Sequence, residues 1–296
     1  MRLACVDIGS NTTRVLVAEP VPGGLREVLA QRAFTAIGPG PIPPERIVAV
    51  AALVAAQVQA ARDAGADRLR VVATAVVRQA PNGPELVAAV RAASRAQVEV
   101  LSAQEEARLA FAGAAHACGG GSAEPIAVVD VGGGSCEIAV GTRAGGAQWS
   151  ASVPLGSAGL AASHLASDPC TVEELGAARG AARAAFDRIE VPAASRAVAV
   201  GGSATSLRRI AGDRLDRAAL DAAVAALVRR PRAEVARELG LAPERVRLLP
   251  AGILLLAAAS ERVGLPLEIA CGGLREGVVL GLIAEPGPAR PAEPGL

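Results

Sequence analysis

Two segments of the sequence each combine a short apolar strand, an acidic residue and a tight polar turn. The acids are Asp7 and Asp130, and the turns after them comprise Gly9, Ser10, Asn11 and Thr12 in the first segment and Gly132, Gly133, Gly134 and Ser135 in the second. Backbone N–H groups in such turns point into one small space and form a nest for phosphate oxygens. A carboxylate does not itself bind phosphate, so the acids indicate a divalent cation between carboxylate and phosphate, with oxygen ligands that suit Mg2+. Two facing segments of this kind predict a cleft that holds a chain of phosphates.

Each of these turns, taken alone, is also explained as the connection of a β-hairpin, which often needs glycine for its backbone conformation. The matched position of the acid in both segments favours the phosphate interpretation. Neither turn completes the pattern Gly-x-Gly-x-x-Gly, since Glu137 stands where the last glycine of the second would be. A dinucleotide site of the Rossmann type is therefore disfavoured.

Two further glycine pairs precede predicted helices. Gly201, Gly202 and Ser203 follow the predicted strand 197–200, and Gly272 and Gly273 follow the predicted strand 267–270. The start of a helix presents free backbone N–H groups to an anion. We expect Gly202 and Ser203 to contact phosphate, whereas a plain helix start explains the second pair equally well.

Glu106 stands near the start of a predicted helix, and the side of this helix that carries Glu106 is otherwise apolar. Its neighbours at +3, +4 and +7 are leucine, alanine and glycine, a face that should pack inward. Partial burial raises the pKa of a carboxyl group, which suits a general base that takes a proton from water. Ser102 and Glu105 form a capping box, which accounts for Glu105 without a functional role. The alternative for Glu106 is a surface acid stabilised by the helix dipole.

All 30 basic side chains are arginine, because the sequence contains no lysine. This excludes the Walker-type phosphate loop, the protein-kinase strand lysine and a pyridoxal Schiff base, which all need an amine. Arg78 follows a predicted strand, and its guanidinium is able to hold phosphate through two hydrogen bonds, with a solvated surface position as the alternative. Five cysteines without a Cys-x-x-Cys pair disfavour a structural zinc site, and two histidines without Gly-x-Ser-x-Gly disfavour a serine hydrolase.

Length and charge narrow the class of protein. The chain has 296 residues and a net charge of +1, so a general nucleic-acid-binding surface is not expected. The apolar run 47–61 contains two glutamines and is shorter than the roughly 20 apolar residues that a membrane span requires. Asp7 interrupts the region where a signal peptide would be apolar. We expect a soluble, cytoplasmic protein that binds neither nucleic acid nor a membrane.

Short apolar runs alternate with longer helical stretches, which predicts an α/β protein with helix-covered sheets. Strands are expected at 3–8, 14–18, 69–73, 98–101, 126–131, 137–140, 197–200 and 267–270. Helices are expected at 44–64, 84–96, 104–115, 171–189, 217–229, 231–239, 250–263 and 274–284. The repeated strand-acid-turn segment implies two similar lobes that face one another. The glycine-rich stretch 118–125 suggests a hinge, so we divide the chain into residues 1–121 and 122–296.

Seven segments match one family in order along nearly the whole chain. They are Asp7-Ile-Gly-Ser-Asn-Thr-Thr-Arg14, Ala73-Thr74 with Arg78 and Asn82, Leu101-Ser102 with Glu105-Glu106-Ala-Arg108-Leu109, Asp130-Val-Gly-Gly-Gly-Ser-Cys-Glu137, Val153-Pro-Leu-Gly-Ser157, Gly201-Gly-Ser-Ala-Thr205 and Gly273-Leu-Arg-Glu-Gly277. Together they resemble the exopolyphosphatase / guanosine pentaphosphate phosphohydrolase (Ppx/GppA) family, in its short form. The resemblance implies the actin/Hsp70/sugar-kinase fold, in which two ribonuclease-H-like lobes surround a central cleft.

The resemblance also implies an activity and roles for particular residues. The reaction would be hydrolysis of the terminal phosphoanhydride of inorganic polyphosphate, guanosine pentaphosphate or both, and a homodimer is expected. Glu106 would activate the attacking water, and the two polar turns would hold phosphate. The Mg2+ ligands would be Asp130 and Glu137 with Asp7, and the phosphoryl oxygens would be clamped by Arg14 and Arg78.

Departures from the family pattern leave other functions open. Gly159 stands where the family usually has arginine, Ala75 where serine or threonine is common, and Pro39 and Pro41 interrupt a loop that usually reads Leu-Gly-x-Gly. One alternative is a non-catalytic sensor of polyphosphate or guanosine phosphates that uses the same cleft. Another is an ATP-dependent kinase or chaperone ATPase of the same fold, for which 296 residues leave little room. Glu106 favours the enzyme, because a sensor has no need of a base there.

Overall fold

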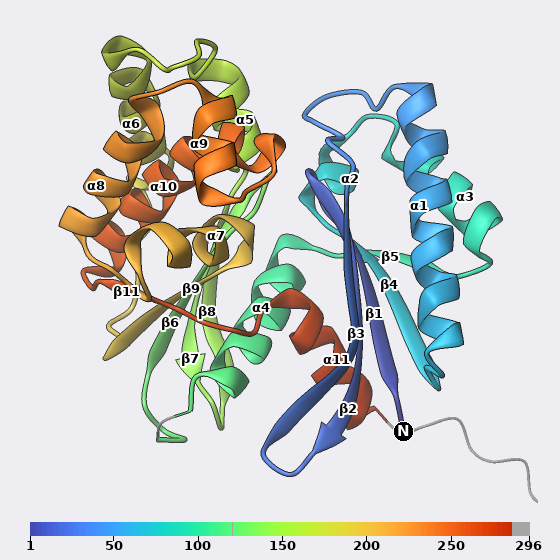
Figure 1. Ribbon diagram of the computed structural model, residues 1–296. Coiled ribbons are helices and arrows are strands. Elements are labelled where there is room, and N and C mark those ends of the chain that lie inside the picture. Colours follow the sequence, from blue (N-terminus) through green and yellow to red (C-terminus); the bar gives the residue numbers. More distant parts are fainter. Residues whose placement is uncertain (120, 286–296) are drawn as a thin grey trace, which may run out of the picture.

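The apolar strands of the first half of the chain form one sheet, seen in the computed structural model, which describes residues 1–119 and 121–285 (Figure 1). Its strands are β1 (Leu3–Ile8), β2 (Thr12–Val21), β3 (Gly24–Phe34), β4 (Arg68–Ala73) and β5 (Val98–Val100), in the order β3-β2-β1-β4-β5. The first three are antiparallel neighbours, and β4 and β5 run parallel to β1. The helices of this half are α1 (Pro44–Asp63), α2 (Ala75–Gln79) and α3 (Gly83–Ser94).

A second sheet follows the same plan. Its strands are β6 (Ile126–Val131), β7 (Cys136–Thr142), β8 (Gly146–Val153), β9 (Arg196–Val200), β10 (Arg214–Leu215) and β11 (Leu267–Ile269), in the order β10-β11-β9-β6-β7-β8. Its helices are α5 (Ser157–His164), α6 (Val172–Phe186), α7 (Gly201–Ala211), α8 (Arg217–Val228), α9 (Arg232–Leu239) and α10 (Pro243–Val263). Apolar residues on most sides of α10 place this helix at the centre of the core of the second lobe.

The two sheets are equivalent where the repeated segments lie. Each begins with an antiparallel hairpin whose first strand also pairs in parallel with a later strand, β4 in one lobe and β9 in the other. Asp7 is paired with Arg14, and Asp130 is paired with Glu137 at the same position of the second hairpin. The prediction of two similar α/β lobes is therefore confirmed.

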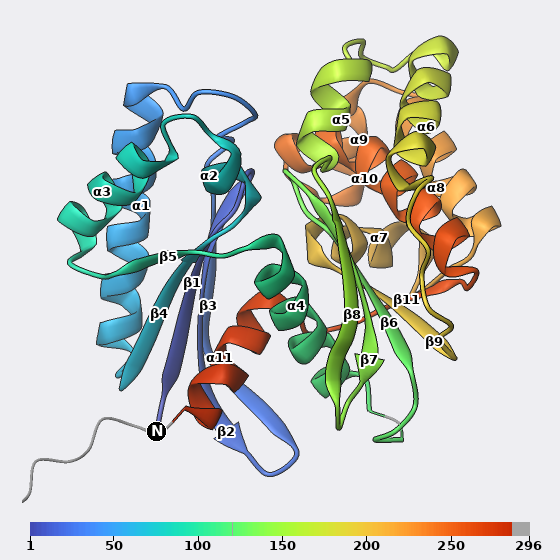
Figure 2. The ribbon, with the colours of Figure 1, turned by 180° about the vertical axis from the view of Figure 1, so that it is seen from behind.

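Two helices join the lobes. The helix α4 (Ala103–Ala117) packs on β6, β7 and β8, whereas α11 (Leu274–Ala284) packs on β1 and β2, and the two helices cross each other (Figure 2). The helix α11, which the predicted division at residue 121 assigns to the second lobe, therefore rests on the sheet of the first. The reason is the apolar surface that α11 shares with the first sheet, including Leu3, Leu16, Val278 and Leu282.

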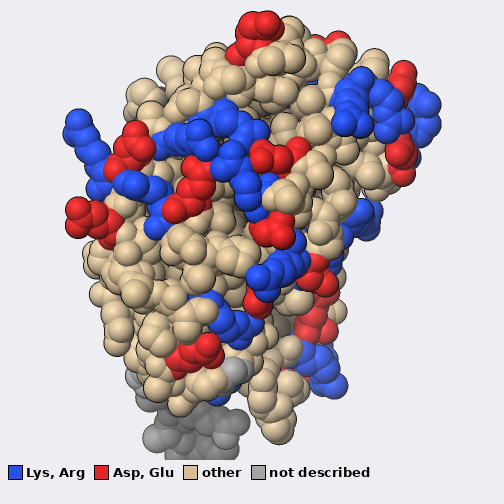
Figure 3. Space-filling view, turned by 90° about the vertical axis from the view of Figure 1, so that its left-hand side faces the viewer, with Lys and Arg blue, Asp and Glu red and all other residues tan. Residues whose placement is uncertain are grey.

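Charged side chains on the outer side of the second lobe are interleaved in sign (Figure 3). Ion pairs connect α6, α8 and α10: Arg179 and Arg217 both contact Asp221, and Arg183 and Arg217 both contact Glu261. Such exposed pairs stabilise a fold by about 0–1 kcal/mol each. Among the helices of residues 1–119 and 121–285, none is both long and apolar enough to cross a membrane.

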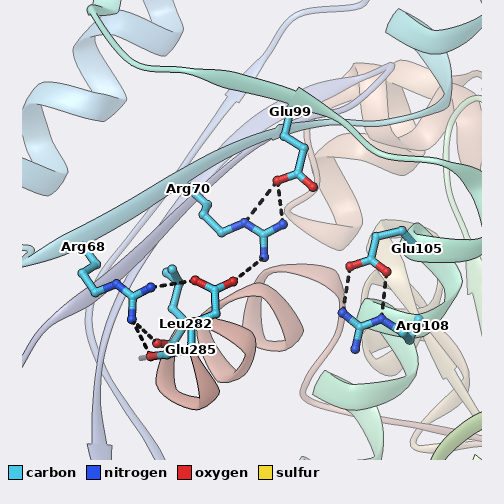
Figure 4. Close-up of polar contacts among 7 residues, drawn as sticks. All are labelled: Arg68, Arg70, Glu99, Glu105, Arg108, Leu282 and Glu285. Carbon is cyan, nitrogen blue, oxygen red and sulfur yellow. Dashed lines mark hydrogen bonds and ion pairs between the residues drawn. The ribbon is translucent and has the colours of Figure 1, made fainter. Parts of the chain in front are cut away.

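The end of α11 is attached to the first sheet by arginines of β4 (Figure 4). Arg68 donates through Nη1 to the carbonyl of Leu282 at 2.6 Å and through Nη2 to Glu285 Oε2 at 2.6 Å. Arg70 donates to Glu99 at 2.6 Å and lies 3.9 Å from Glu285 Oε1. These contacts satisfy a carbonyl of the last helical turn that has no partner within the helix.

The structure departs from the predicted elements at sheet edges and around proline. The outer strands β3 and β8 were not predicted, because both are largely half-buried or exposed and lack an apolar pattern. The short helices α2 and α5 were also missed. The helix predicted to begin at Pro250 begins at Pro243 instead, with Pro250 inside it. Burial on nearly every side of α10 offsets the usual destabilisation of a helix by an internal proline.

Candidate functional site

One cavity between the lobes collects most of the predicted site residues. It has a volume of about 930 Å³, including the part that is open to solvent. Its lining comes from the ends of β1, β4, β6 and β9, from the starts of α4, α7 and α11, and from α10. Of the predicted residues, those that line it are Asp7, Gly9, Ser10, Asn11, Thr12, Arg14, Glu106, Asp130, Gly132, Gly133, Gly134, Ser135, Gly202 and Ser203, whereas Arg78 and Glu137 do not.

The two polar turns face each other in this cavity. Each is closed by one backbone hydrogen bond, from Gly9 N to Thr12 O and from Gly132 N to Ser135 O, both at 3.0 Å. A Cβ atom placed on Gly133 would lie 2.8 Å from Ser10 Cβ and 2.3 Å from Asn11 Nδ2, so the turns approach closely enough to require glycine here. Their backbone N–H groups are thus gathered in one space, as an anion nest requires.

Two half-buried acids lie beside the turns. Burial raises the pKa of Asp130 to about 6, and the negative charge of Asp7 contributes in the same direction. Burial also raises the pKa of Asp7, whose Oδ1 atom is buried and accepts no hydrogen bond from any described residue. Two like charges close together in a dry site repel each other, so this pair gains most from a cation or from protonation.

Glu106 is buried at the start of α4, with 7% of its surface exposed. Burial raises its pKa to about 7, although Arg78 opposes the shift by donating a hydrogen bond from Nη1 to Glu106 Oε2 at 3.0 Å. The same Nη1 atom donates to the carbonyl of Leu101 at 2.6 Å. Arg78, expected to clamp phosphate, is therefore held beside Glu106 and fixes the orientation of that carboxylate.

Glu137, expected among the metal ligands, lies behind the cavity wall. It is paired with Asp130 across β6 and β7, is 2% exposed, and accepts a hydrogen bond from Ser152 Oγ at 2.8 Å. Burial raises its pKa, and the charges of Glu106 and Asp130 raise it further. Glu137 has Asp130 of β6 on one side and Ser152 of β8 on the other, and its carboxylate accepts a hydrogen bond from Ser152 instead of lining the cavity.

The structure adds a cation that sequence reasoning missed. Arg245 of α10 lines the cavity, is 5% exposed, and has a buried Nε atom without a partner among the described residues. Burial lowers its pKa to about 10. A Cβ atom on Gly202 would lie 2.8 Å from both Nη atoms of Arg245 and 3.0 Å from Arg14 Nη2, so Gly202 leaves the space in which these guanidinium groups converge. Thr74, Ser157 and Arg275 also line the cavity and were not predicted.

The acids fit a Mg2+ ion that keeps ligands from outside the protein. In the part of the chain that the structure describes, no group of three or more His, Cys, Asp and Glu side chains is placed to hold a metal ion. Mg2+ usually retains several waters and takes one or two carboxylates together with phosphate oxygens. Asp7, with its unpartnered buried oxygen, and Asp130 fit this pattern.

These raised pKa values make stability depend on pH. Between about pH 4.5 and 7, the folded protein retains protons on Glu106 and Asp130 that the unfolded chain has released, so the free energy of unfolding falls as pH rises. Without divalent cations or phosphate, we expect a lower thermal unfolding midpoint at about pH 7.5 than at about pH 5.5. Asp130→Asn should flatten this dependence, whereas a wild-type midpoint that rises over the interval would contradict it.

Comparison with known proteins finds one family whose model matches most of the chain. The model of the Ppx/GppA phosphatase family matches residues 36–285. An uncharacterized protein of Streptomyces coelicolor is 35% identical, over 99% of this chain and 93% of its own length. The guanosine-5'-triphosphate,3'-diphosphate pyrophosphatase of Aeromonas hydrophila is 27% identical over 95% of this chain, which spans only 59% of that relative.

Solved structures show the same fold. An Aquifex aeolicus PPX-GPPA enzyme matches with a TM-score of 0.77 and 25% identity, covering 96% of this chain and 99% of its own. An exopolyphosphatase from Cytophaga hutchinsonii matches with a TM-score of 0.83 and 19% identity, covering 96% of this chain and 98% of its own. The two-lobed, actin-like fold expected from the sequence is thereby confirmed.

Proposed function

Because the chain belongs to the Ppx/GppA phosphatase family, we propose that it hydrolyses the terminal phosphoanhydride of inorganic polyphosphate, guanosine pentaphosphate or both. The observation that carries the proposal is the cavity in which two facing glycine turns, two arginines and the buried carboxyl of Glu106 converge. Phosphoryl transfer depends mainly on positioning and on stabilisation of charge, and these groups supply both.

In the proposed reaction, the terminal phosphate lies against the turns that follow Asp7 and Asp130. Glu106 accepts a proton from a water molecule as that water attacks the terminal phosphorus. The bond from phosphorus to the bridging oxygen breaks, and the shortened chain leaves with the bonding electron pair. Arg78 holds Glu106 Oε2, which keeps the carboxylate in one orientation during proton transfer.

Arg14 and Arg245 are suited to neutralise the phosphoryl oxygens. Both lie at the cavity wall beside Gly202, and guanidinium groups bind phosphate through charge-assisted hydrogen bonds. Asp7 and Asp130 would hold Mg2+, which would supply positive charge to the phosphate oxygens. We also propose that the reaction depends on Mg2+, and that the protein is a homodimer located in the cytoplasm.

The alternative is a sensor that binds the same anions without hydrolysis. Three of the departures from the family pattern line the main cavity or a smaller cavity beside it. Ala75 lines the main cavity with a methyl group that offers no hydrogen bond, and Gly159 lines a smaller neighbouring cavity of about 430 Å³ together with Pro39. The buried base Glu106 favours hydrolysis over sensing.

The deciding experiment is phosphate release by the purified protein on long-chain polyphosphate and on guanosine pentaphosphate, with and without Mg2+. We expect release that depends on Mg2+, and the ratio of the two rates would identify the preferred substrate. Tight binding of either compound without any release, at several Mg2+ concentrations, would reject the hydrolase and support the sensor.

A further inference from the structure

A row of charged residues crosses the first sheet at the level of the cavity. Asp7 on β1 is paired with Arg14 on β2, and Arg14 is paired in turn with Arg32 on the edge strand β3. Directly opposite residues of antiparallel strands share a face, with Cβ atoms about 4.5–5.5 Å apart. Arg14 and Arg32 are thus like charges at directly opposite positions, an arrangement that destabilises a sheet unless an anion lies between them.

Arg32 has no carboxylate partner among residues 1–119 and 121–285, although other arginines on strands do. Arg26 on the same strand contacts Glu19, Arg70 contacts Glu99, and Arg196 contacts Glu268. The guanidinium of Arg32 lies instead over the ring of Phe34, 5.1 Å from its centre. This cation–π contact restrains the side chain while leaving its N–H groups free to bind an anion.

Arg14 and Arg245 line this end of the cavity, and Arg32 lies beside Arg14 on the neighbouring edge strand. Burial is the main cause that lowers the pKa of both Arg14 and Arg245, and the charge of Arg32 contributes in the same direction. The acids Asp7 and Asp130 act on Arg14, but the pKa of Arg245 is lowered by burial and by the two other arginines alone. The Nε atom of Arg245 is buried and has no hydrogen-bond partner among the described residues, and the charges that act on this guanidinium are positive.

We infer that Arg32, which lies beside Arg14 on the edge strand β3, forms an outer anion subsite that binds a phosphate group beyond the one that Arg14 and Arg245 contact. The inference rests on the proposed function, in which the terminal phosphate lies at the two turns beside Glu106. A substrate long enough to reach β3 gains the contact with Arg32, and a short one does not. Arg32 therefore sets a preference for long inorganic chains or for nucleotides that carry several phosphates.

The test compares Arg32→Gln with Arg26→Gln, which removes another exposed arginine of the same strand. We expect kcat/KM on long-chain polyphosphate to fall about tenfold in Arg32→Gln, mainly through KM, as for loss of one charge-assisted hydrogen bond. Hydrolysis of pyrophosphate should change little, Arg26→Gln should behave as wild type, and Arg32→Lys should recover part of the loss. Equal losses on short and long substrates, or no loss on either, would overturn the inference.

Binding measurements separate this inference from the proposed function. If the wild-type protein releases no phosphate, calorimetric titration with tripolyphosphate and with pyrophosphate still reports on the subsite. Weaker binding of tripolyphosphate to Arg32→Gln, with unchanged binding of pyrophosphate, would support the subsite although the hydrolase is rejected. Equal affinities of wild type and Arg32→Gln for tripolyphosphate would reject the subsite.

Discussion

Glu106→Gln should reduce phosphate release about 10³-fold or more while leaving the binding of polyphosphate close to that of wild type. Glutamine has the shape of glutamate and still accepts a hydrogen bond from Arg78, but it takes no proton from water. The buried position that raises the pKa of Glu106 to about 7 is what gives the carboxylate enough basicity for this task. The measurement is a rate of phosphate release paired with calorimetric titration of the same preparation.

The neighbouring residue provides a matched control. Glu105 is one position away on α4, but its carboxylate points outward and is held by Arg108 through hydrogen bonds of 2.7 and 2.8 Å (Figure 4). Glu105→Gln should therefore retain wild-type turnover. Near-wild-type turnover in Glu106→Gln would remove Glu106 as the base, and loss of binding in that variant would assign it a structural role instead.

The site residues that could be predicted from the sequence are those that lie close together within one short segment of the chain. In each hairpin the acid, the turn and the returning strand are adjacent along the chain, so the arrangement in sequence is preserved in space. Glu106 was accessible for a similar reason, because the periodicity of one helix shows which side is apolar. The place where the two hairpins meet is set by the fold. Because the strand order is similar in both sheets, the two turns lie at equivalent positions and face each other.

Contacts between distant segments were the part that could not be predicted. Arg245 lies on a stretch of α10 before Pro250 to which the sequence analysis assigned no helix, so nothing marked its direction toward the cavity. Arg78 fits a phosphate clamp by residue type, yet its partner Glu106 comes from another helix. The edge strand β3 has no apolar face, and so neither the strand nor the pairing of Arg32 with Arg14 was visible.

Gly113→Ala is expected to destabilise the fold strongly, because it adds a methyl group where α4 and α11 cross. A Cβ atom on Gly113 would lie 2.0 Å from the carbonyl oxygen of Gly273 and 2.8 Å from the nitrogen of Gly277. Both neighbours are backbone atoms, so relief requires one helix to move. Overpacking of this kind costs about 1–3 kcal/mol or more, which lowers the thermal midpoint by several degrees, at about 2–4 °C per kcal/mol.

A glycine-to-alanine substitution at an exposed helix position should increase the stability of the protein instead of lowering it. Gly180 lies on the exposed side of α6 with nothing within 4 Å of an added Cβ, and Gly180→Ala should stabilise the protein by about 0.5–1 kcal/mol through helix propensity. Because α4 carries Glu106 and α11 begins beside Arg275 and Glu276 at the cavity, Gly113→Ala should also reduce turnover in the folded protein. A Gly113→Ala protein that unfolds at or above the wild-type temperature would contradict this prediction. It would show that α4 and α11 accommodate the added methyl group by moving apart, and that their close crossing does not stabilise the arrangement of the two lobes.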